Sequence, residues 1–166
     1  MNNGRRVVIT GLGVISPVGN DIATFWDSLK SGRCGIGPLT GMDLHGLPIH
    51  VAGNIKDFDP SAFGLSGADK RRNDLYSQYA LAAASQVMKS SGLVSGENIE
   101  PERFGVYAGT GIGGMNTFVS QTKVLLEEGA DRISPLFIPM MIPNIAGGNI
   151  AIKYNAQGPC LTHVSA

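Results

Sequence analysis

Cysteine, charge and long apolar runs are all scarce in this sequence of 166 residues. The only cysteines, Cys34 and Cys160, lie too far apart for the paired spacing of a zinc site. Charged residues amount to 16%, and 13 basic residues balance 13 acidic ones. A chain without net charge has no overall field that attracts nucleic acid or an anionic membrane, so we expect neither as a partner.

Export and membrane signals are missing as well. No apolar run reaches the roughly 18 residues needed to span a bilayer, and residues 1–6 lack the apolar stretch of a signal peptide. Unpaired cysteines without an export signal are typical of the cytoplasm, where thiols stay reduced. The hydrophobic fraction of 43% suffices for a globular core. We therefore expect a soluble, cytoplasmic protein whose surplus apolar surface suits a partner.

Strand and helix candidates alternate along the chain, which predicts an α/β fold with a mixed or parallel sheet and helices on both faces. Residues 69–91 show helical spacing, and the small residues at 80–85 indicate a central, buried helix. The prolines of the segment 134–144 exclude a regular helix there. The expected strands are 7–10, 49–52, 104–108 and a run near Leu161; the other expected helices run from the cap Asp21 towards Gly32, over 115–128 up to Gly129, and from the cap Asn144 to about residue 154.

A glycine-rich segment, GTGIGG at residues 109–114, lies between an expected strand and an expected helix. Its letters match the dinucleotide fingerprint, in which a helix N-terminus binds a pyrophosphate. That fingerprint also needs an acidic residue at the end of a second strand about 20 residues later, and no such strand is expected there. In a second interpretation the glycines let a loop pass close to a substrate, with Ile112 projecting from it. In a third, Ile112 belongs to the core.

The end of the chain, GPCLTHVSA at residues 158–166, has the pattern of a buried strand that leads into a tight strand-to-helix corner. Together with RRVVITGLG at residues 5–13 and the glycine-rich segment, it resembles the β-ketoacyl-acyl-carrier-protein synthases, in particular the synthases II of bacterial fatty-acid synthesis. The resemblance covers the whole chain. It implies a thiolase-like fold of two similar halves, of which residues 1–166 are the N-terminal half.

The resemblance also implies an activity. A cysteine directly after Ala166 would be the nucleophile that accepts an acyl group, and decarboxylation of malonyl-acyl-carrier protein would supply the carbanion that attacks it. Two histidines and a lysine of the missing half would assist, so the chain alone is expected to be inactive. The family needs no metal and no nucleotide cofactor.

By the same resemblance, the acyl pocket is lined by Ile112, Phe137, Ile138 and Ile142. The last three lie in the apolar segment 134–144, which in the family crosses the interface of a homodimer and reaches the partner's pocket. An apolar, nearly uncharged segment suits a buried interface. The alternative is that this segment packs against the missing half of the chain.

The densest positive cluster is Lys70, Arg71 and Arg72, at the start of the long expected helix. Cations at a helix N-terminus oppose its dipole, so helix stability does not explain them and a partner is suggested. In the family such a patch docks the acidic helix of acyl-carrier protein, and Arg71 and Arg72 match two of its basic positions, whereas Ala68 stands at a third. The alternative is a solvated basic face.

Two residues near the end of the chain have ordinary interpretations. Cys160 begins the expected buried strand, where a thiol usually behaves as a small hydrophobic group and not as a nucleophile. His163 is expected to be a hydrogen-bonded core histidine, and it is not one of the family's catalytic histidines. His45 and His50 fall in an irregular stretch, where we expect them to be solvated or to act as caps.

Two rival functions stay open. A polyketide-type ketosynthase, or a non-catalytic chain-length subunit, would share every motif named above, and only the residue after Ala166 and the missing histidines would separate them from a fatty-acid synthase. A dinucleotide-binding module is the other rival, because it rests on the same glycine-rich segment.

Overall fold

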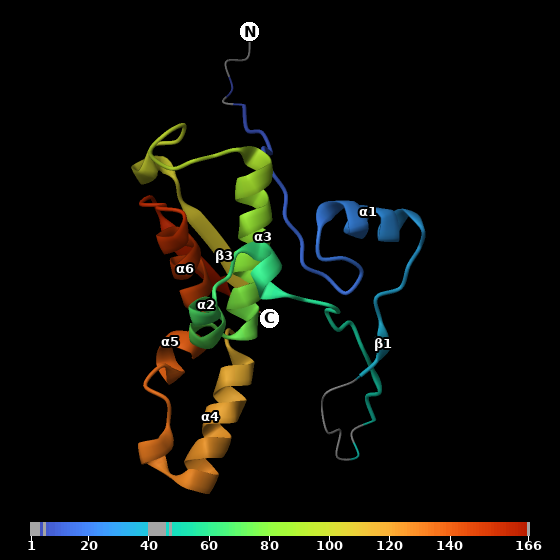
Figure 1. Ribbon diagram of the computed structural model, residues 1–166, viewed down its shortest axis with the longest axis vertical. Helices are drawn as coiled ribbons and strands as arrows, with labels where there is room; N and C mark the ends of the chain where they lie inside the picture. The colour runs from blue at the N-terminus through green and yellow to red at the C-terminus, as the bar shows by residue number, and fades with distance from the viewer. Residues whose placement is uncertain (1–3, 5, 40–45, 47, 166) are drawn as a thin grey trace.

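The computed structural model describes residues 4, 6–39, 46 and 48–165, so Arg5, His45 and Ala166 lie outside the described residues. Helices, short 3-10 helices and strands alternate along this part of the chain (Figure 1). In chain order they are α1 (Ile22–Lys30), β1 (Gly37–Pro38), β2 (Val51–Ala52), η1 (Pro60–Phe63), α2 (Gly67–Arg72), α3 (Leu75–Ser91), η2 (Pro101–Arg103), β3 (Val106–Thr110), α4 (Met115–Glu128), η3 (Ala130–Arg132), α5 (Phe137–Met141), α6 (Ile145–Lys153) and β4 (Cys160–Val164).

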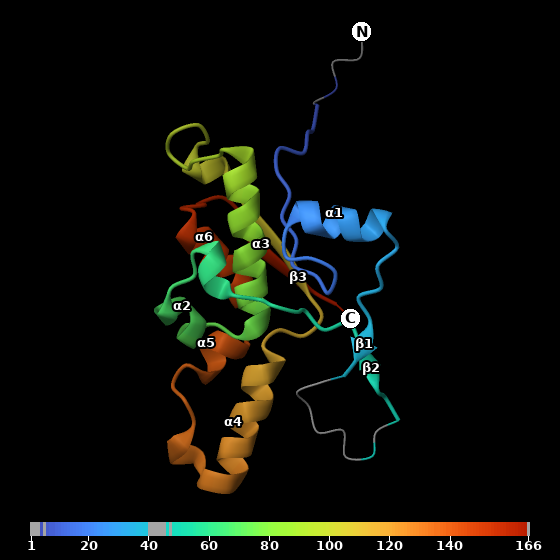
Figure 2. The same ribbon diagram turned by 45° about the vertical axis from the view of Figure 1, so that its right-hand side comes forward.

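The central unit is the parallel pair β3 and β4, with α6 packed on it and α3 packed on α6. Figures 1 and 2 show α3 beside α6, with β3 running behind α3. Gly147 of α6 is buried against the two strands. A Cβ atom at this position would lie 3.5 Å from the Cβ of Ala108 in β3 and 3.2 Å from the Oγ1 of Thr162 in β4. A helix with so small a residue can approach the strands closely.

The α/β class predicted from the alternating pattern is confirmed, since strands and helices both occur along the chain. In the described part, β1 and β2 form an antiparallel sheet, and β3 and β4 form a separate parallel one. Side chains of a strand alternate between faces. Ala108 and Thr162 face α6, whereas Tyr107 and Leu161, on the opposite face, are 78% and 53% exposed. The described helices therefore cover one face of the β3–β4 pair, whereas helices on both faces were predicted, and the other face is open within the described residues.

The long helix expected over residues 69–91 is two helices, α2 and α3, separated at Asn73 and Asp74. Asn73 has extended backbone angles, φ −125° and ψ 131°, which end α2, and the side chain of Asp74 accepts a hydrogen bond from the N–H of Tyr76 to begin α3. The side chains of Asn and Asp hydrogen-bond to nearby backbone groups and so compete with the hydrogen bonds of a continuous helix. The prediction of one long helix did not take this into account. The predicted burial of α3 is confirmed, because Leu81 and Ala82 are buried in the core.

The first expected strand, residues 7–10, is not formed within the described part of the chain, and Val7 is 88% exposed. A strand needs a neighbour that completes its ladder, and no described strand lies beside this segment. The chain instead packs along α3 directly afterwards, where Val14 and Gln86 exchange hydrogen bonds of 3.3 and 2.9 Å. Gly11 and Gly13 permit this approach, since a Cβ atom at either position would collide with a carbonyl oxygen of α3.

The remaining predicted elements agree with the structure except at two points, whereas β1 and the 3-10 helices were not predicted. The helix over residues 115–128 and its end at Gly129 are confirmed, and so are the cap at Asp21 and the strands near residues 51, 106 and 160. The segment 134–144, however, contains the short helix α5 despite Pro139, which lies in its first turn, where no helical N–H bond is lost. Asn144 precedes α6 as expected, but its side chain makes no capping bond.

In the described part of the chain, every helix is too short or too polar to cross a lipid bilayer.

Candidate active site

The glycine-rich loop, residues 109–114, connects β3 to α4 and presses against the segment that leads from α5 to α6. The N–H of Gly114 donates to the carbonyl of Met141 at 2.9 Å. Gly113 has φ +94°, and a Cβ atom there would lie 2.6 Å from the same carbonyl oxygen. These two glycines are therefore required by contact with protein backbone, whereas the sequence suggested contact with a substrate.

Ile112 projects from this loop over an apolar pocket of about 310 Å³. Its side chain is 62% exposed, which excludes the interpretation that Ile112 is a core residue of the described structure. Ligand pockets are concave and mostly apolar, and this one is of suitable size for part of a hydrocarbon chain. The pocket is lined by Ile112, Gly114, Met115, Phe118, Met141 and Pro143.

The other predicted pocket residues surround this cavity without lining it. The ring centre of Phe137 lies 6.3 Å from that of Phe118, which lines the pocket. The carbonyl of Ile142 accepts a 2.6 Å hydrogen bond from the hydroxyl of Tyr76, which holds the chain next to the pocket. Ile138 is exposed on α5. Contact of these residues with an acyl chain stays a prediction.

Met115, Phe118, Met141 and Pro143 were not predicted as pocket residues. Their sequence signal is weak, because an apolar side chain in an amphipathic helix looks the same whether it faces a pocket or a core. Phe118 and Met115 lie one turn apart on α4, directly after the glycine-rich loop, and this proximity to the loop was the available clue.

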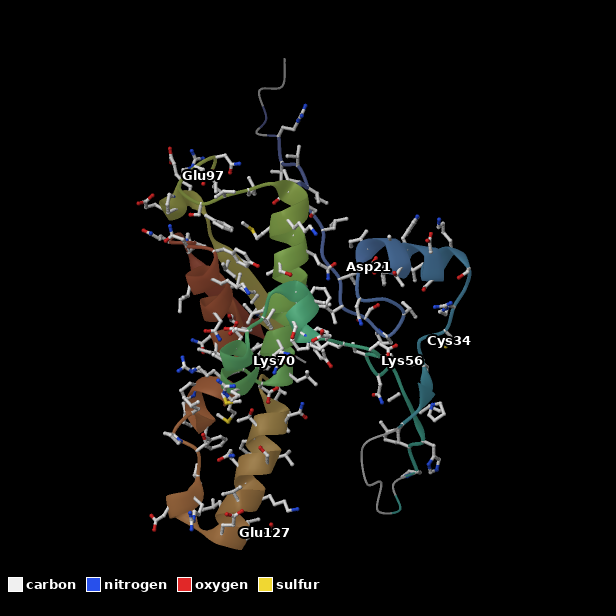
Figure 3. All side chains as sticks on the ribbon, in the orientation of Figure 1. Asp21, Cys34, Lys56, Lys70, Glu97 and Glu127 are labelled. Carbon is white, nitrogen blue, oxygen red and sulfur yellow. The ribbon has the colours of Figure 1, made fainter. Side chains whose placement is uncertain are left out.

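The start of α4 is occupied by a carboxylate of the protein itself. Asp74 is 4% exposed, and its Oδ2 accepts the N–H of Thr117 at 2.7 Å. A dinucleotide phosphate would need this helix N-terminus. The fingerprint also needs an acidic residue at the end of a second strand, to bind the ribose. Figure 3 shows Glu127 at the far end of α4, and the element that follows α4 is the 3-10 helix η3 and not a strand. The geometry thus argues against a dinucleotide site.

The end of β4 lies next to the glycine-rich loop. Val164 pairs with Thr110 at the end of the parallel ladder, and the N–H of Ser165 donates to the carbonyl of Thr110 at 3.1 Å. The chain therefore leaves β4 beside the loop that carries Ile112. Ala166, after which a nucleophile is expected, lies outside the described residues.

Cys160 and His163 are both exposed, which contradicts the burial predicted for them. The reason is that β4 has a single partner strand among the described residues and that one face of the pair is open. Cys160 lies at the opposite end of β4 from the glycine-rich loop. This position is compatible with the prediction that Cys160 is not the nucleophile.

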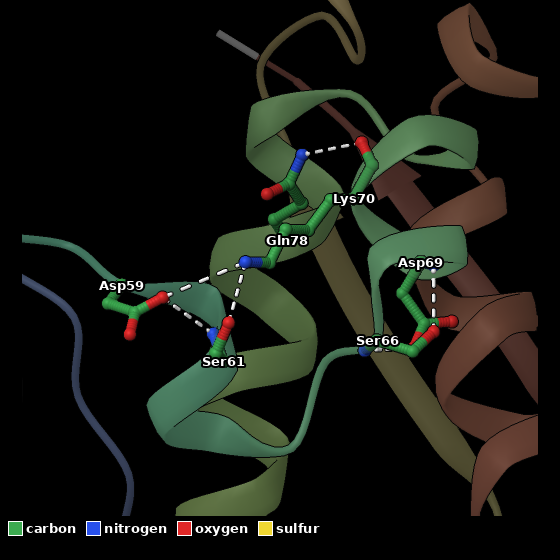
Figure 4. Close-up of polar contacts among 6 residues, drawn as sticks. All are labelled: Asp59, Ser61, Ser66, Asp69, Lys70 and Gln78. Carbon is green, nitrogen blue, oxygen red and sulfur yellow. Dashed lines mark hydrogen bonds and ion pairs between the residues drawn. The ribbon is translucent and has the colours of Figure 1, made fainter.

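The basic cluster lies in the last turn of α2, not at the start of a long helix. This position corrects the argument from the sequence, because cations near a helix C-terminus are favourable and need no partner to explain them. The Nζ of Lys70 binds the Oγ of Ser61 at 2.6 Å and lies 3.8 Å from Asp59, so Lys70 joins α2 to η1 (Figure 4). Arg71 and Arg72 are exposed and remain the candidates for docking.

A capping box begins α2 and fixes its orientation. The Oδ2 of Asp69 accepts the N–H and the hydroxyl of Ser66 at 2.7 and 2.8 Å, and the N–H of Asp69 donates to the Ser66 Oγ at 3.1 Å (Figure 4). The bonds from Ser66 lower the pKa of Asp69, and the charges of Lys153 and Arg72 contribute in the same direction. The short helix is thus anchored at both ends.

No group of three His, Cys, Asp or Glu side chains within the described ranges is arranged to hold a metal ion.

Comparison with known proteins gives a consistent result. The model of the beta-ketoacyl synthase N-terminal domain matches residues 4–166. The 3-oxoacyl-acyl-carrier-protein synthase 2 of Staphylococcus aureus (strain COL) is 41% identical over 159 residues, which are 96% of this chain and 38% of that protein.

Solved structures agree with this match. The ishigamide ketosynthase/chain length factor has a TM-score of 0.86 at 25% identity, over 96% of this chain and 40% of its own. A ketosynthase structure solved with its type II PKS acyl-carrier protein has a TM-score of 0.72 at 25% identity, over 90% of this chain and 39% of its own. The chain thus spans about two fifths of the length of these proteins, and it has the fold that was predicted for it. From the match of residues 4–166 to this domain and the 41% identity to a synthase over 96% of the chain, we conclude that the chain belongs to the β-ketoacyl synthase family.

Proposed function

We propose that residues 1–166 are the N-terminal half of a 3-oxoacyl-acyl-carrier-protein synthase that elongates fatty acids in the cytoplasm. The observation that carries this proposal is the 41% identity to a synthase of that name over nearly the whole chain. The geometry supports it, because the last strand ends beside an apolar pocket that carries Ile112. In this arrangement a nucleophile after Ala166 would lie near a cavity for its acyl group.

The proposed reaction has two stages. A cysteine thiolate following Ala166 attacks the acyl thioester of a carrier protein, forms an acyl-enzyme and releases the carrier thiol. Malonyl-acyl-carrier protein then loses carbon dioxide, and the resulting carbanion attacks the acyl carbonyl. A carbon–carbon bond forms, the enzyme thiolate leaves, and the product is a 3-oxoacyl thioester two carbons longer. The other catalytic groups belong to the second half of the enzyme.

In this proposal Ile112 limits the acyl pocket, and the enzyme is a homodimer. Phe137, Ile138 and Ile142 then serve the partner's pocket, as the resemblance implies. Ile138 is exposed and Leu136 beside it is partly exposed, so α5 presents apolar surface that a dimer interface would cover.

The proposed partner of α2 is acyl-carrier protein. Arg71 and Arg72 are exposed on a helix that Lys70 and the Ser66–Asp69 capping box hold in place. Support also comes from the related ketosynthase that was solved in complex with an acyl-carrier protein. A positive patch of this kind attracts an acidic helix and mainly increases the rate of association.

The test is condensation by the full-length protein. Supplied with an acyl-acyl-carrier protein and malonyl-acyl-carrier protein, it should release carbon dioxide and form the 3-oxoacyl product. Replacing the residue after Ala166 by alanine should abolish acyl transfer. If that residue is not a cysteine, or if the intact protein forms no 3-oxoacyl product from either carrier-bound substrate, the proposal is wrong.

A second candidate is a polyketide ketosynthase or a chain-length subunit, and the TM-score of 0.86 to a ketosynthase/chain length factor favours it. The same assay separates the two functions. Repeated extension without reduction of the keto groups indicates a polyketide enzyme, and a chain-length subunit would lack the nucleophile altogether.

A further inference from the structure

Asp74 connects the start of α3 to the start of α4. One carboxylate oxygen, Oδ1, accepts the N–H of Tyr76 in α3 at 3.2 Å, and the other, Oδ2, accepts the N–H of Thr117 in α4 at 2.7 Å. The residue is 4% exposed, and Thr117 is buried as well. A buried carboxylate is retained only where hydrogen bonds satisfy it, and here two helix N-termini do so.

The same residue touches the glycine-rich loop. A Cβ atom at Gly114 would lie 3.1 Å from the Cβ of Asp74, so the loop passes directly over this side chain. Gly113 is held on the other side by the Oγ1 of Thr110, which accepts its N–H at 3.1 Å. Ile112 precedes these glycines, and its position over the pocket depends on where they are fixed.

We propose that Asp74 is a positioning residue that fixes the glycine-rich loop, and with it Ile112, at the wall of the acyl pocket. By this means Asp74 sets which acyl chain lengths the pocket accepts. The inference deepens the proposed function and rests on it for the identity of the ligand. Asp74 itself does not contact the chain; it acts through Thr117, Gly114 and Ile112.

Only a side chain with two acceptor oxygens at this distance can serve both helices. Asparagine has nearly the same shape but offers one acceptor and one donor, so it can cap α3 or α4 and leaves an N–H of the other helix without a partner. Serine is also a good helix cap, but its oxygen lies one bond nearer the backbone and cannot bridge. Both variants therefore break the bridge: Asp74→Ser retains a cap on α3, whereas Asp74→Asn retains a cap on only one of the two helices.

The experiment compares the full-length protein with Asp74→Asn and with the control Asp21→Asn. Asp21 is a matched control because it caps a single helix, α1, with its Oδ1 2.9 Å from the N–H of Thr24. Hydrogen exchange is followed by mass spectrometry in peptides that cover residues 109–118. The acyl preference is measured as the ratio of kcat/KM for a long and a short acyl-acyl-carrier protein.

In Asp74→Asn we expect exchange in residues 109–118 to become at least about tenfold faster, as a lost hydrogen bond to a charged group would cause. The ratio of kcat/KM should change at least about threefold, because a displaced pocket wall alters discrimination between chains. Asp21→Asn should leave both quantities as in the wild type. Should Asp74→Asn fail to fold, Asp74→Ser provides the same comparison.

Unchanged exchange, or an unchanged ratio in a variant that folds and condenses, overturns the inference. These results differ from a failure of the proposed function, which would appear as an intact wild-type protein without condensing activity. In that case the exchange data alone decide whether Asp74 fixes the loop.

Discussion

Tyr76 shows how a single side chain can hold the wall of the pocket. Its hydroxyl donates to the carbonyl of Ile142 at 2.6 Å, and burial raises its pKa, so the hydroxyl keeps its proton. Tyr76→Phe leaves that carbonyl without this donor and should lower the free energy of unfolding by about 1–2 kcal/mol. Urea denaturation of the full-length protein measures this. Tyr107→Phe is the control, since Tyr107 is exposed, and equal effects of the two variants would contradict the assignment.

The Ser66–Asp69 pair predicts a dependence on pH. Its hydrogen bonds hold the pKa of Asp69 below the ordinary value of 3.8, so the ionised form is favoured by folding. The resulting stability is present above pH 3.8 and is lost as the pH falls through the lower folded value. Ser66→Ala should cost about 1 kcal/mol at neutral pH, and its difference from the wild type should shrink in acid.

Urea midpoints of both proteins between neutral pH and about pH 3 test this, the lower limit lying just below the usual pKa of aspartate. Ser120→Ala is the control, because the Oγ of Ser120 binds only the carbonyl of Thr117 and no carboxylate. A difference between wild type and Ser66→Ala that stays constant over the whole pH range would refute the link to Asp69.

Among single residues, the sequence predicted one residue that lines the pocket, but it did not predict the residues that hold it in position. Ile112 was found because it is the bulky residue in a run of glycines. Asp74, Phe118 and Met141 were not found, because what gives them meaning is proximity across the fold. A cap such as Asp74 has a visible signal for its own helix, but nothing in the sequence shows that its second oxygen serves α4.

At the scale of the element, α2 is the feature with the clearest consequence. Because its cations lie at the favourable end of the helix, their presence alone does not prove a partner. The double variant Arg71→Glu with Arg72→Glu should nevertheless reduce kcat/KM for carrier-bound substrates by at least about tenfold at low salt, since it replaces attraction by repulsion. The loss should diminish as salt is added, and small-molecule thioester substrates should be unaffected.

Matched reversals test whether the effect belongs to α2. Lys30→Glu with Lys89→Glu changes the charge by the same amount on other helices, and we expect little effect on carrier-bound substrates. If both double variants lose activity equally, the loss reflects total charge and docking at α2 is refuted. Lys70→Glu should behave differently again, because it breaks the contact with Ser61 and lowers stability.

Elements were predictable where their signals are local. The ends of α4 agree with the sequence because glycines flank it on both sides. The break between α2 and α3 was missed because the apolar spacing continues through Asn73 and Asp74, whose side chains turn away to cap and to bond across helices. The segment 7–10 has the composition of a strand, but strand formation depends on a neighbour, and the described chain provides none.

For the whole molecule, the alternation of strands and helices correctly predicted the α/β class. It could not show which face of the β3–β4 pair is open, because that depends on which helices pack on the strands.

The open face of the β3–β4 pair predicts that the chain associates. Tyr107 and Leu161 lie exposed on that face, and the segment 7–9 adds further exposed apolar residues elsewhere on the surface. Apolar surface of this extent normally mediates association. Residues 1–166 expressed alone should therefore form concentration-dependent oligomers in sedimentation velocity at micromolar concentration. Tyr107→Lys with Leu161→Lys should reduce this association, whereas Lys89→Ala should not. A stable, monodisperse monomer would show that this face needs no cover, and would count against a second half that packs on it.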